Sequence, residues 1–213
     1  MLSNEKNTKK KTVSWDYLAN IYDIYVYLIN RKTHETLVKE IASLILPTDE
    51  VLECACGTGM LTKVMAPKCK KLVATDFSKN MLKKTKKKCD KYVNIEYMTA
   101  DVMQLDFEDE SFDKVVAGNV IHLLDEPVKA LNEFIRVCRS GGQIIIPTYV
   151  NKESGVNPFV KFLQKTGIVI GQKFTFTTYK QFFIEAGLSD VEYIMINGMI
   201  PCAVAIISKN GRR

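Results

Sequence analysis

Several features that define specialised protein classes are missing from this chain of 213 residues. It has no Cys-x-x-Cys pair: its six cysteines are scattered, at positions 54, 56, 69, 89, 138 and 202. This scatter fits neither a disulfide framework nor a zinc site. No apolar run is long enough to span a bilayer, since the longest candidate, Ile200 to Ile207, contains Pro201. The N-terminus is lysine-rich and lacks the apolar stretch of a signal peptide. We therefore expect reduced thiols, no bound metal, no membrane partner and a cytoplasmic location.

Positive charge is unevenly distributed along the chain. The formal net charge is +6, but the first twelve residues hold four lysines against one acid, and a second group lies at 83, 84, 86, 87, 88 and 91. Such a run is typical of the solvated face of a helix, so we do not favour nucleic acid as a partner. With 46% hydrophobic and 25% charged residues, the composition is that of an ordinary globular domain with a large core.

Apolar segments and helical patterns alternate through the middle of the chain. We expect strands near 51–54, 71–75, 93–98, 112–118 and 143–149, with helices at 60–65, 78–89 and 125–139 between them. The Ser140-Gly141-Gly142 stretch is expected to stop the third of these helices. Strict alternation of this kind predicts an α/β fold with a doubly wound, Rossmann-like parallel sheet covered on both faces.

The ends of the chain differ from this core. Residues 1–12 are predicted to be a disordered tail, 13–48 an N-terminal helical addition, 49–150 the core and 151–176 a possible cover over the site. In 177–208, Thr178 to Gln181 has a capping-box pattern that opens a helix. Asn197-Gly198 then separates two apolar runs, 191–196 and 199–208, and this dipeptide predicts a tight antiparallel hairpin. Residues 13–213 therefore form a single domain.

The stretch from Val51 to Met60 has the pattern of a strand, a glycine turn and a helix start. Gly57 and Gly59 lack a Cβ, so a ligand can approach the backbone closely there. Glu53 stands at the carboxyl end of the strand, where open α/β sheets bind their ligands. A nicotinamide-binding turn would need glycine at position 62, which is Thr62, so an NAD(P)-dependent oxidoreductase is the less favoured alternative.

Several ordered motifs together resemble the class I S-adenosylmethionine-dependent methyltransferases, and more narrowly the methyltransferase type 11 or ubiquinone/menaquinone-biosynthesis-like group. They are Glu53-Cys54-Ala55-Cys56-Gly57-Thr58-Gly59, an acid after each of the next two strands, and the closing hairpin. Ahead of them, residues 16–23 match a D-x-x-A-x-x-Y-D pattern of such enzymes. The resemblance covers about residues 49–208 and implies a seven-stranded sheet in the order 3-2-1-4-5-7-6, with strand 7 antiparallel.

The resemblance implies a binding site for S-adenosyl-L-methionine, with S-adenosyl-L-homocysteine as product. Gly57 and Gly59 would let the backbone pass the methionine and ribose, with Cys54 and Ala55 on the same turn. Ala55 stands where the family commonly has its first glycine. Glu53 would direct negative potential toward the ammonium or sulfonium.

Residues after the next strands complete this expected site. Asp76 would accept hydrogen bonds from the ribose hydroxyls, and Phe77 would lie against the adenine. Asp101 would accept from the adenine amino group, while the amide of Val102 would donate to a ring nitrogen. Asn119 stands where the family holds the amino end of methionine. An Asp in such places also commonly forms a turn or caps a helix.

The acceptor pocket is the least defined part of the expected site. His122, one of only two histidines, is the candidate general base, with packing against the following helix as the alternative. Tyr17, Tyr22 and Tyr149 are candidate pocket residues, with plain packing again the alternative. The Asn-Pro-Pro-Tyr pattern of methyltransferases that act on DNA bases is absent after Asn119. We expect a small-molecule acceptor; RNA or protein methylation, and a catalytically silent cofactor-binding regulator, remain the alternatives.

Overall fold

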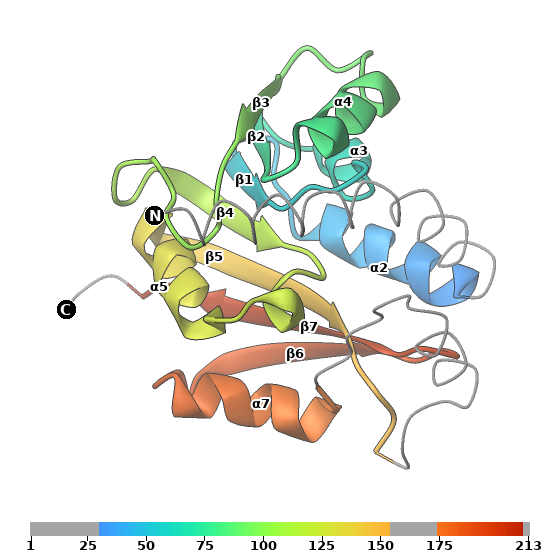
Figure 1. The fold of residues 1–213 in the computed structure, drawn as a ribbon, viewed down its shortest axis with the longest axis vertical. Helices are drawn as coiled ribbons and strands as arrows, with labels where there is room; N and C mark the ends of the chain where they lie inside the picture. Colours follow the sequence, from blue (N-terminus) through green and yellow to red (C-terminus); the bar gives the residue numbers. More distant parts are fainter. Residues whose placement is uncertain (1–29, 154–173, 211–213) are drawn as a thin grey trace, which may run out of the picture.

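A computed structural model describes residues 30–153 and 174–210. Within these ranges seven strands form one sheet in the order β3-β2-β1-β4-β5-β7-β6 (Figure 1). The strands are β1 (Glu50–Cys54), β2 (Lys71–Asp76), β3 (Ile95–Thr99), β4 (Phe112–Ala117), β5 (Cys138–Tyr149), β6 (Val191–Ile196) and β7 (Cys202–Ser208). The helices are α2 (Arg31–Ser43), α3 (Thr62–Met65), α4 (Lys79–Lys88), η1 (Ile121–Leu123), α5 (Pro127–Val137) and α7 (Phe176–Glu185). The described part contains no helix with the length and apolarity needed to cross a bilayer.

The sheet confirms the predicted strand order. The first five strands pair in parallel, and β7 pairs antiparallel with both β5 and β6. Tyr17, Tyr22, the tail and most of the expected cover segment (154–173) lie outside the described residues. The described ends of that segment meet where Asn151 bridges Thr175 at the end of β5.

Both faces of the sheet are covered, as the continuous apolar strands predict. Successive strand residues point to opposite faces, so Ile144 and Ile146 pack in one core cluster and Ile145 in another. The first cluster includes Phe134 of α5 and Phe183 of α7; the second includes residues of α2 and α3. Figure 1 shows α2, α3 and α4 on one side and α5 and α7 on the other. The result is a three-layer sandwich.

Parallel pairing brings the carboxyl ends of β1 to β4 to one edge of the sheet. The registers pair Cys54 with Ala117 and Asp76 with Thr99, so these strands end side by side. The turn after β1 and the residues that follow the other three strands therefore share this edge, which we call the carboxyl edge. The opposite edge carries ion pairs such as those from Arg139 to Glu50 and Asp113.

The predicted stop at Ser140-Gly141-Gly142 is wrong. The helix α5 ends at Val137 and β5 begins at once, so these three residues belong to the strand. The pairing with β4 shifts between Phe112 and Lys114, and a Cβ on Gly142 would lie 2.6 Å from the Asp113 carbonyl oxygen. The glycines accommodate a strand irregularity and a close backbone approach, which glycine in a strand often marks.

The hairpin is antiparallel as predicted, but its turn is longer than two residues. Ile196 pairs with Cys202, so residues 197–201 form the loop. A Cβ on Gly198 would lie 1.9 Å from the Thr33 hydroxyl oxygen. Asn30 holds the loop by donating to the Ile200 carbonyl (2.7 Å) and accepting from its amide (3.2 Å). This glycine therefore serves close packing against the start of α2.

The capping box of α7 lies three residues earlier than predicted. Thr175 is the N-cap, and its hydroxyl accepts a hydrogen bond from the Thr178 amide. The Thr178 hydroxyl in turn accepts from the Thr175 amide at 2.8 Å. Reciprocal capping satisfies two amides that the first helical turn leaves without partners, and it fixes where the helix begins.

Candidate functional site

The turn after β1 is built from three left-handed backbone positions. Ala55, Gly57 and Gly59 have φ values of 55°, 56° and 80°. The Cys56 amide donates to the Thr75 carbonyl at 2.8 Å, which ties the turn to the end of β2. A Cβ on Gly57 would meet no heavy atom within 4 Å, whereas one on Gly59 would lie 2.8 Å from Thr85 Cγ2. Gly57 thus leaves open space beside the backbone, and Gly59 allows close contact with α4.

Asp76, the last residue of β2, holds this turn in place. Its Oδ2 accepts a hydrogen bond from the Gly57 amide and its Oδ1 accepts from the Ser78 amide, both at 2.8 Å. The residue is 9% exposed. Each carboxylate oxygen can accept more than one hydrogen bond, so this side chain can shape the turn and also bind hydroxyl groups. Phe77, the next residue, is 45% exposed and presents a ring at the same edge.

Glu53 is a buried carboxyl group at the end of β1. It is 2% exposed, and its Oε2 accepts a hydrogen bond of 2.5 Å from the hydroxyl of Thr62. Burial raises the pKa of Glu53 to about 8, and the negative charge of Asp76 acts in the same direction, while the hydrogen bond from Thr62 lowers it. Glu53 is therefore mostly protonated at neutral pH.

Asp101 and Val102 lie just beyond β3. The Asp101 side chain accepts from the Met103 amide at 2.9 Å, which is the local turn that a short acidic side chain commonly forms. Asp101 is nevertheless exposed, whereas Val102 is buried. The carboxylate is thus available at the carboxyl edge in addition to its turn-forming contact.

Asn119 follows β4 in the left-handed conformation, with φ of 55°. Its Oδ1 accepts from the Tyr149 amide at 3.0 Å, and its own amide donates to the Pro147 carbonyl at 2.8 Å. The side chain thereby joins the ends of β4 and β5. Its side-chain oxygen is engaged within the protein, so recognition of a ligand here would fall mainly to the backbone.

The candidate acceptor residues that the structure describes are buried. His122 lies in η1 and is 7% exposed, and Tyr149 ends β5 at 5% exposed. Both stand at the carboxyl edge. Their roles as base and pocket residue stay predictions.

The cysteines of the turn are part of the core. Cys54 is fully buried and Cys56 is 6% exposed. Burial raises the pKa of both thiols far above the ordinary value, which leaves them protonated and unreactive. All six cysteines are free, and the described residues contain no group of three or more His, Cys, Asp or Glu side chains that could hold a metal ion.

The sequence did not single out two threonines that organise the site. Thr62 stands where a nicotinamide-binding turn would have its third glycine, and its hydroxyl donates to the Glu53 carboxyl group. Thr85 is fully buried on α4, and its hydroxyl donates to the Gly57 carbonyl at 2.7 Å. Its place on the apolar side of a lysine-rich helix was the only signal in the sequence.

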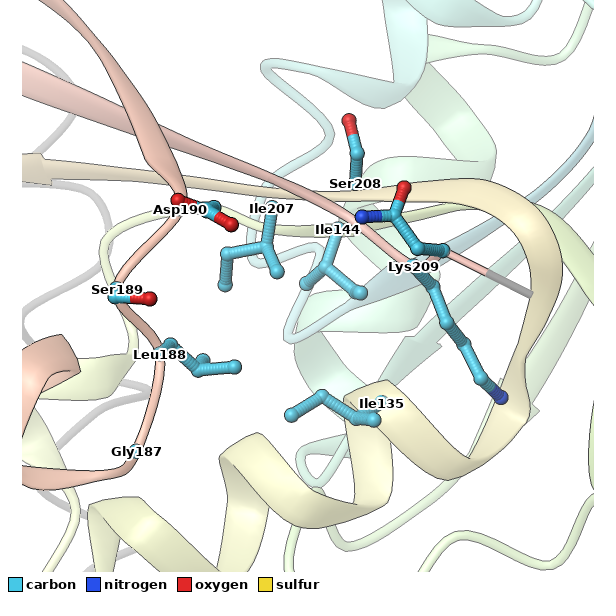
Figure 2. Close-up of a pocket in the computed structure, with 10 residues that line it drawn as sticks. Ile135, Ile144, Gly187, Leu188, Ser189, Asp190, Ile207, Ser208 and Lys209 are labelled. Carbon is cyan, nitrogen blue, oxygen red and sulfur yellow. The ribbon is translucent and has the colours of Figure 1, made fainter. Parts of the chain in front are cut away.

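Two hollows lie away from this site. One of about 270 Å³ opens between α5, the segment after α7 and the end of β7, and Figure 2 shows Ile135, Leu188 and Ile207 lining it. Another of about 350 Å³ is lined by residues near the starts of β1, β2 and β4, among them Glu50 and Lys71. The residues predicted to bind a cofactor gather instead at the carboxyl edge, so neither hollow is the predicted site.

Comparisons with known proteins show which proteins the chain is similar to. Residues 52–146 match the family model described as "Methyltransferase domain". The chain is 35% identical over 98 residues to a demethylmenaquinone methyltransferase of Clavibacter sepedonicus; the aligned region covers 46% of this chain and 40% of that protein. It is 29% identical to the enzyme of the same name from Renibacterium salmoninarum, over 72% of this chain and 64% of that protein. The chain thus spans less than two thirds of the length of these two relatives.

A solved structure shows the same fold. A SAM-dependent methyltransferase from Thermotoga maritima superposes with a TM-score of 0.69 at 18% identity, over 92% of this chain and 98% of that one.

Proposed function

We propose that this chain, whose residues 52–146 match the methyltransferase domain model, transfers a methyl group from S-adenosyl-L-methionine to a small-molecule acceptor. The observation that carries the proposal is that both backbone groups of Gly57 are hydrogen-bonded to side chains: its amide donates to Asp76, and its carbonyl accepts from Thr85. These two hydrogen bonds fix Gly57, which has open space beside its backbone, next to the Asp76 carboxylate. Both residues lie at the edge of the sheet where such folds bind their ligands.

The residues of this edge fit the parts of such a cofactor. Asp76 would accept from the ribose hydroxyls, because it is a carboxylate at the end of β2 whose oxygens also hold the Gly57 and Ser78 amides of the same edge, and each such oxygen can accept more than one hydrogen bond. Phe77 would cover one face of the adenine, and Asp101 and the Val102 amide would bind its polar edge. Cys54 and Ala55 would line the path of the methionine through backbone atoms, since the Cys54 side chain is fully buried.

At the end of β1, the carboxyl group of Glu53 would complement a cationic part of the ligand. Glu53 would ionise when a positively charged group binds, because an opposite charge nearby lowers the pKa that burial has raised. When bound, the cofactor supplies a methyl group already activated by a positive sulfur. The protein's part is then to align an acceptor with the sulfur-to-methyl bond and to exclude water.

We propose a quinone-type ring as the first acceptor to test, because the two curated relatives act on demethylmenaquinone. If the acceptor retains a proton at the reacting atom, His122 is the proposed proton acceptor. Tyr149, with Tyr17 and Tyr22, would contribute to the wall of the acceptor pocket.

Calorimetry with S-adenosylmethionine and with S-adenosylhomocysteine tests the cofactor site. We expect Asp76→Asn to weaken binding tenfold or more, because the neutral amide has a single acceptor oxygen in place of two, and its NH2 group cannot accept from a backbone amide or a ribose hydroxyl. Asp49→Asn is the matched control: Asp49 is 5% exposed and accepts from the Leu46 amide, but it lies ahead of β1 at the opposite edge. No binding at millimolar ligand, or Asp76→Ala binding as tightly as the parent, would refute the proposal.

Turnover separates an enzyme from a silent cofactor-binding protein. Transfer of a labelled methyl group to demethylmenaquinone, to other small acceptors or to RNA identifies the substrate class. Cofactor binding without transfer to any acceptor would favour the regulatory alternative. Binding of NAD(H) in place of S-adenosylmethionine would favour the oxidoreductase alternative.

A further inference from the structure

The outer side of α4 is a stripe of positive charge. Lys79, Lys83, Lys86 and Lys87 are spaced i, i+4, i+7 and i+8, so they share one side of the helix, and all four are exposed. The buried residues of α4 are Met81, Leu82 and Thr85, on the opposite side. We call the four exposed residues the lysine stripe.

The stripe is not neutralised by ion pairs in the part of the chain that the structure describes. None of its members makes an ion pair with a described carboxylate, and α4 has no acid in its first turn. The partial negative charge at the end of a helix favours Lys86 and Lys87, but the same dipole disfavours Lys79 at the first helical position. Like charges spaced i, i+4 also repel. Helix stability therefore does not account for the stripe.

An apolar side chain projects into solvent just beyond the helix. Val93 is 101% exposed, more than any other large hydrophobic residue among those described. The side chain of Lys91 lies over the ring of Tyr92, with its Nζ 5.0 Å from the ring centroid. Val93 follows Lys91 by two residues and α4 by five, and an exposed aliphatic group on a lysine-rich segment is a combination that binds the interface of an anionic bilayer.

The stripe is close to the candidate cofactor site. The side of α4 opposite the stripe contacts the turn after β1, through the hydrogen bond from Thr85 to the Gly57 carbonyl. The Lys88 ammonium also donates to the Thr58 hydroxyl at 3.3 Å. A surface that binds the stripe would thus lie about one helix diameter, roughly 10 Å, from the turn.

We propose that the lysine stripe and Val93 form a docking surface for an anionic lipid bilayer, which places the carboxyl edge beside a membrane-dissolved acceptor. This inference rests on the proposed function and extends it to where the acceptor is taken up. Binding at the surface of a bilayer requires no spanning helix. The features favour lipid over nucleic acid, because the exposed side chain of Val93 is aliphatic, which suits the interface of a bilayer and offers no ring for base stacking.

Sedimentation of the full chain with vesicles tests the proposal. We expect binding to phosphatidylcholine vesicles that contain phosphatidylglycerol and none to phosphatidylcholine alone. The triple variant K83E/K86E/K87E should lose at least about a hundredfold in partitioning, since each lysine near an anionic surface contributes roughly fivefold. Val93→Ser should lose several-fold. The matched control K32E/K39E/K129E changes the net charge equally at exposed lysines away from α4 and should bind like the parent.

The outcomes distinguish the docking surface from the cofactor site. Equal vesicle binding by the parent and the α4 variant, or an equal loss in the control, overturns the docking proposal. So does RNA binding that exceeds vesicle binding and is lost in the α4 variant. Calorimetry with S-adenosylmethionine should give the same affinity for parent and α4 variant. Binding of the chain to vesicles but not to the cofactor would support the docking surface and refute the proposed function. Binding to the cofactor but not to vesicles would support the proposed function and refute the docking surface.

Discussion

Replacement of Glu53 by glutamine should change how the stability of the protein depends on pH. The Glu53 carboxyl is buried, and its pKa is raised from 4.5 to about 8. The folded state therefore binds a proton that the unfolded state releases above pH 4.5. The contribution of this group to stability is fully present below pH 4.5 and is lost as the pH rises toward 8. Glutamine has nearly the same shape and does not titrate.

The size of the effect follows from the pKa shift. Between the two pKa values, the parent loses about 1.4 kcal/mol of unfolding free energy per pH unit relative to the variant. The stability of Glu53→Gln minus that of the parent should therefore rise by about 3 kcal/mol between pH 5 and pH 7. The hydroxyl of Thr62 can still donate to the amide oxygen of glutamine, so this contact is retained.

Urea unfolding followed by circular dichroism at pH 5, 6, 7 and 8 measures this difference. Glu133→Gln is the matched control, because the hydrogen bond with Arg136 lowers the pKa of Glu133 and it stays ionised throughout this range. Its stability difference from the parent should be constant across the four pH values. A constant difference for Glu53→Gln as well would refute the conclusion that Glu53 is buried in its neutral form.

Three further predictions concern the fold around the site. Ala55→Gly should stabilise the protein by about 1 kcal/mol, because φ of 55° strains a residue with a Cβ. Gly198→Ala should destabilise it by about 1–3 kcal/mol, since the new Cβ would overlap Thr33. Tyr179→Phe should cost about 1–2 kcal/mol, because its buried hydroxyl donates to a β5 carbonyl at 2.6 Å. Chemical unfolding measures all three. Gly141→Ala is the control for Ala55→Gly: it adds a Cβ at a position with φ of 82° and no neighbouring atoms within 4 Å, so it should destabilise the protein through backbone strain alone.

Each of these has a result that would contradict it. A loss of stability in Ala55→Gly would show that the left-handed position carries no strain. Thr33→Ala should relieve part of the cost of Gly198→Ala, so strictly additive effects would contradict the overlap. An unchanged unfolding free energy for Tyr179→Phe would mean that the hydroxyl and the carbonyl are equally well solvated without each other.

Prediction from the sequence succeeded where the local hydrophobic pattern and the packing of the whole domain favour the same secondary structure and the same sheet. Apolar strands separated by helices can be buried on both faces only in a parallel layered sheet, and the observed strand order is the predicted one. It failed where a distant segment decides the local structure. The dipeptide Asn197-Gly198 predicts a two-residue turn, but the loop covers 197–201, and the start of α2, more than 160 residues earlier, packs against Gly198.

The same division applies to the candidate site. The resemblance to a methyltransferase family assigned Gly57, Asp76 and Asp101 to one predicted site, and the parallel sheet brings the ends of their strands to one edge. It could not show that the Asp76 carboxylate itself holds the Gly57 amide, or that Thr85 reaches the same turn from α4. Those contacts join residues 19 and 28 positions apart, and their existence depends on side-chain directions that periodicity does not contain.

By itself, then, the sequence determined the layered sheet, its carboxyl edge and the residue types gathered there, because burial and chain direction follow from hydrophobic pattern alone. Only the tertiary structure decided which of those groups are charged and which are exposed. Glu53 is mostly protonated at neutral pH because its side chain is buried at the end of β1, and the lysines of α4 face solvent because the other side of the helix, with Thr85, packs against the turn at Gly57. Solvation and hydrogen bonding are properties of the packed environment, and the chain acquires them only when it folds.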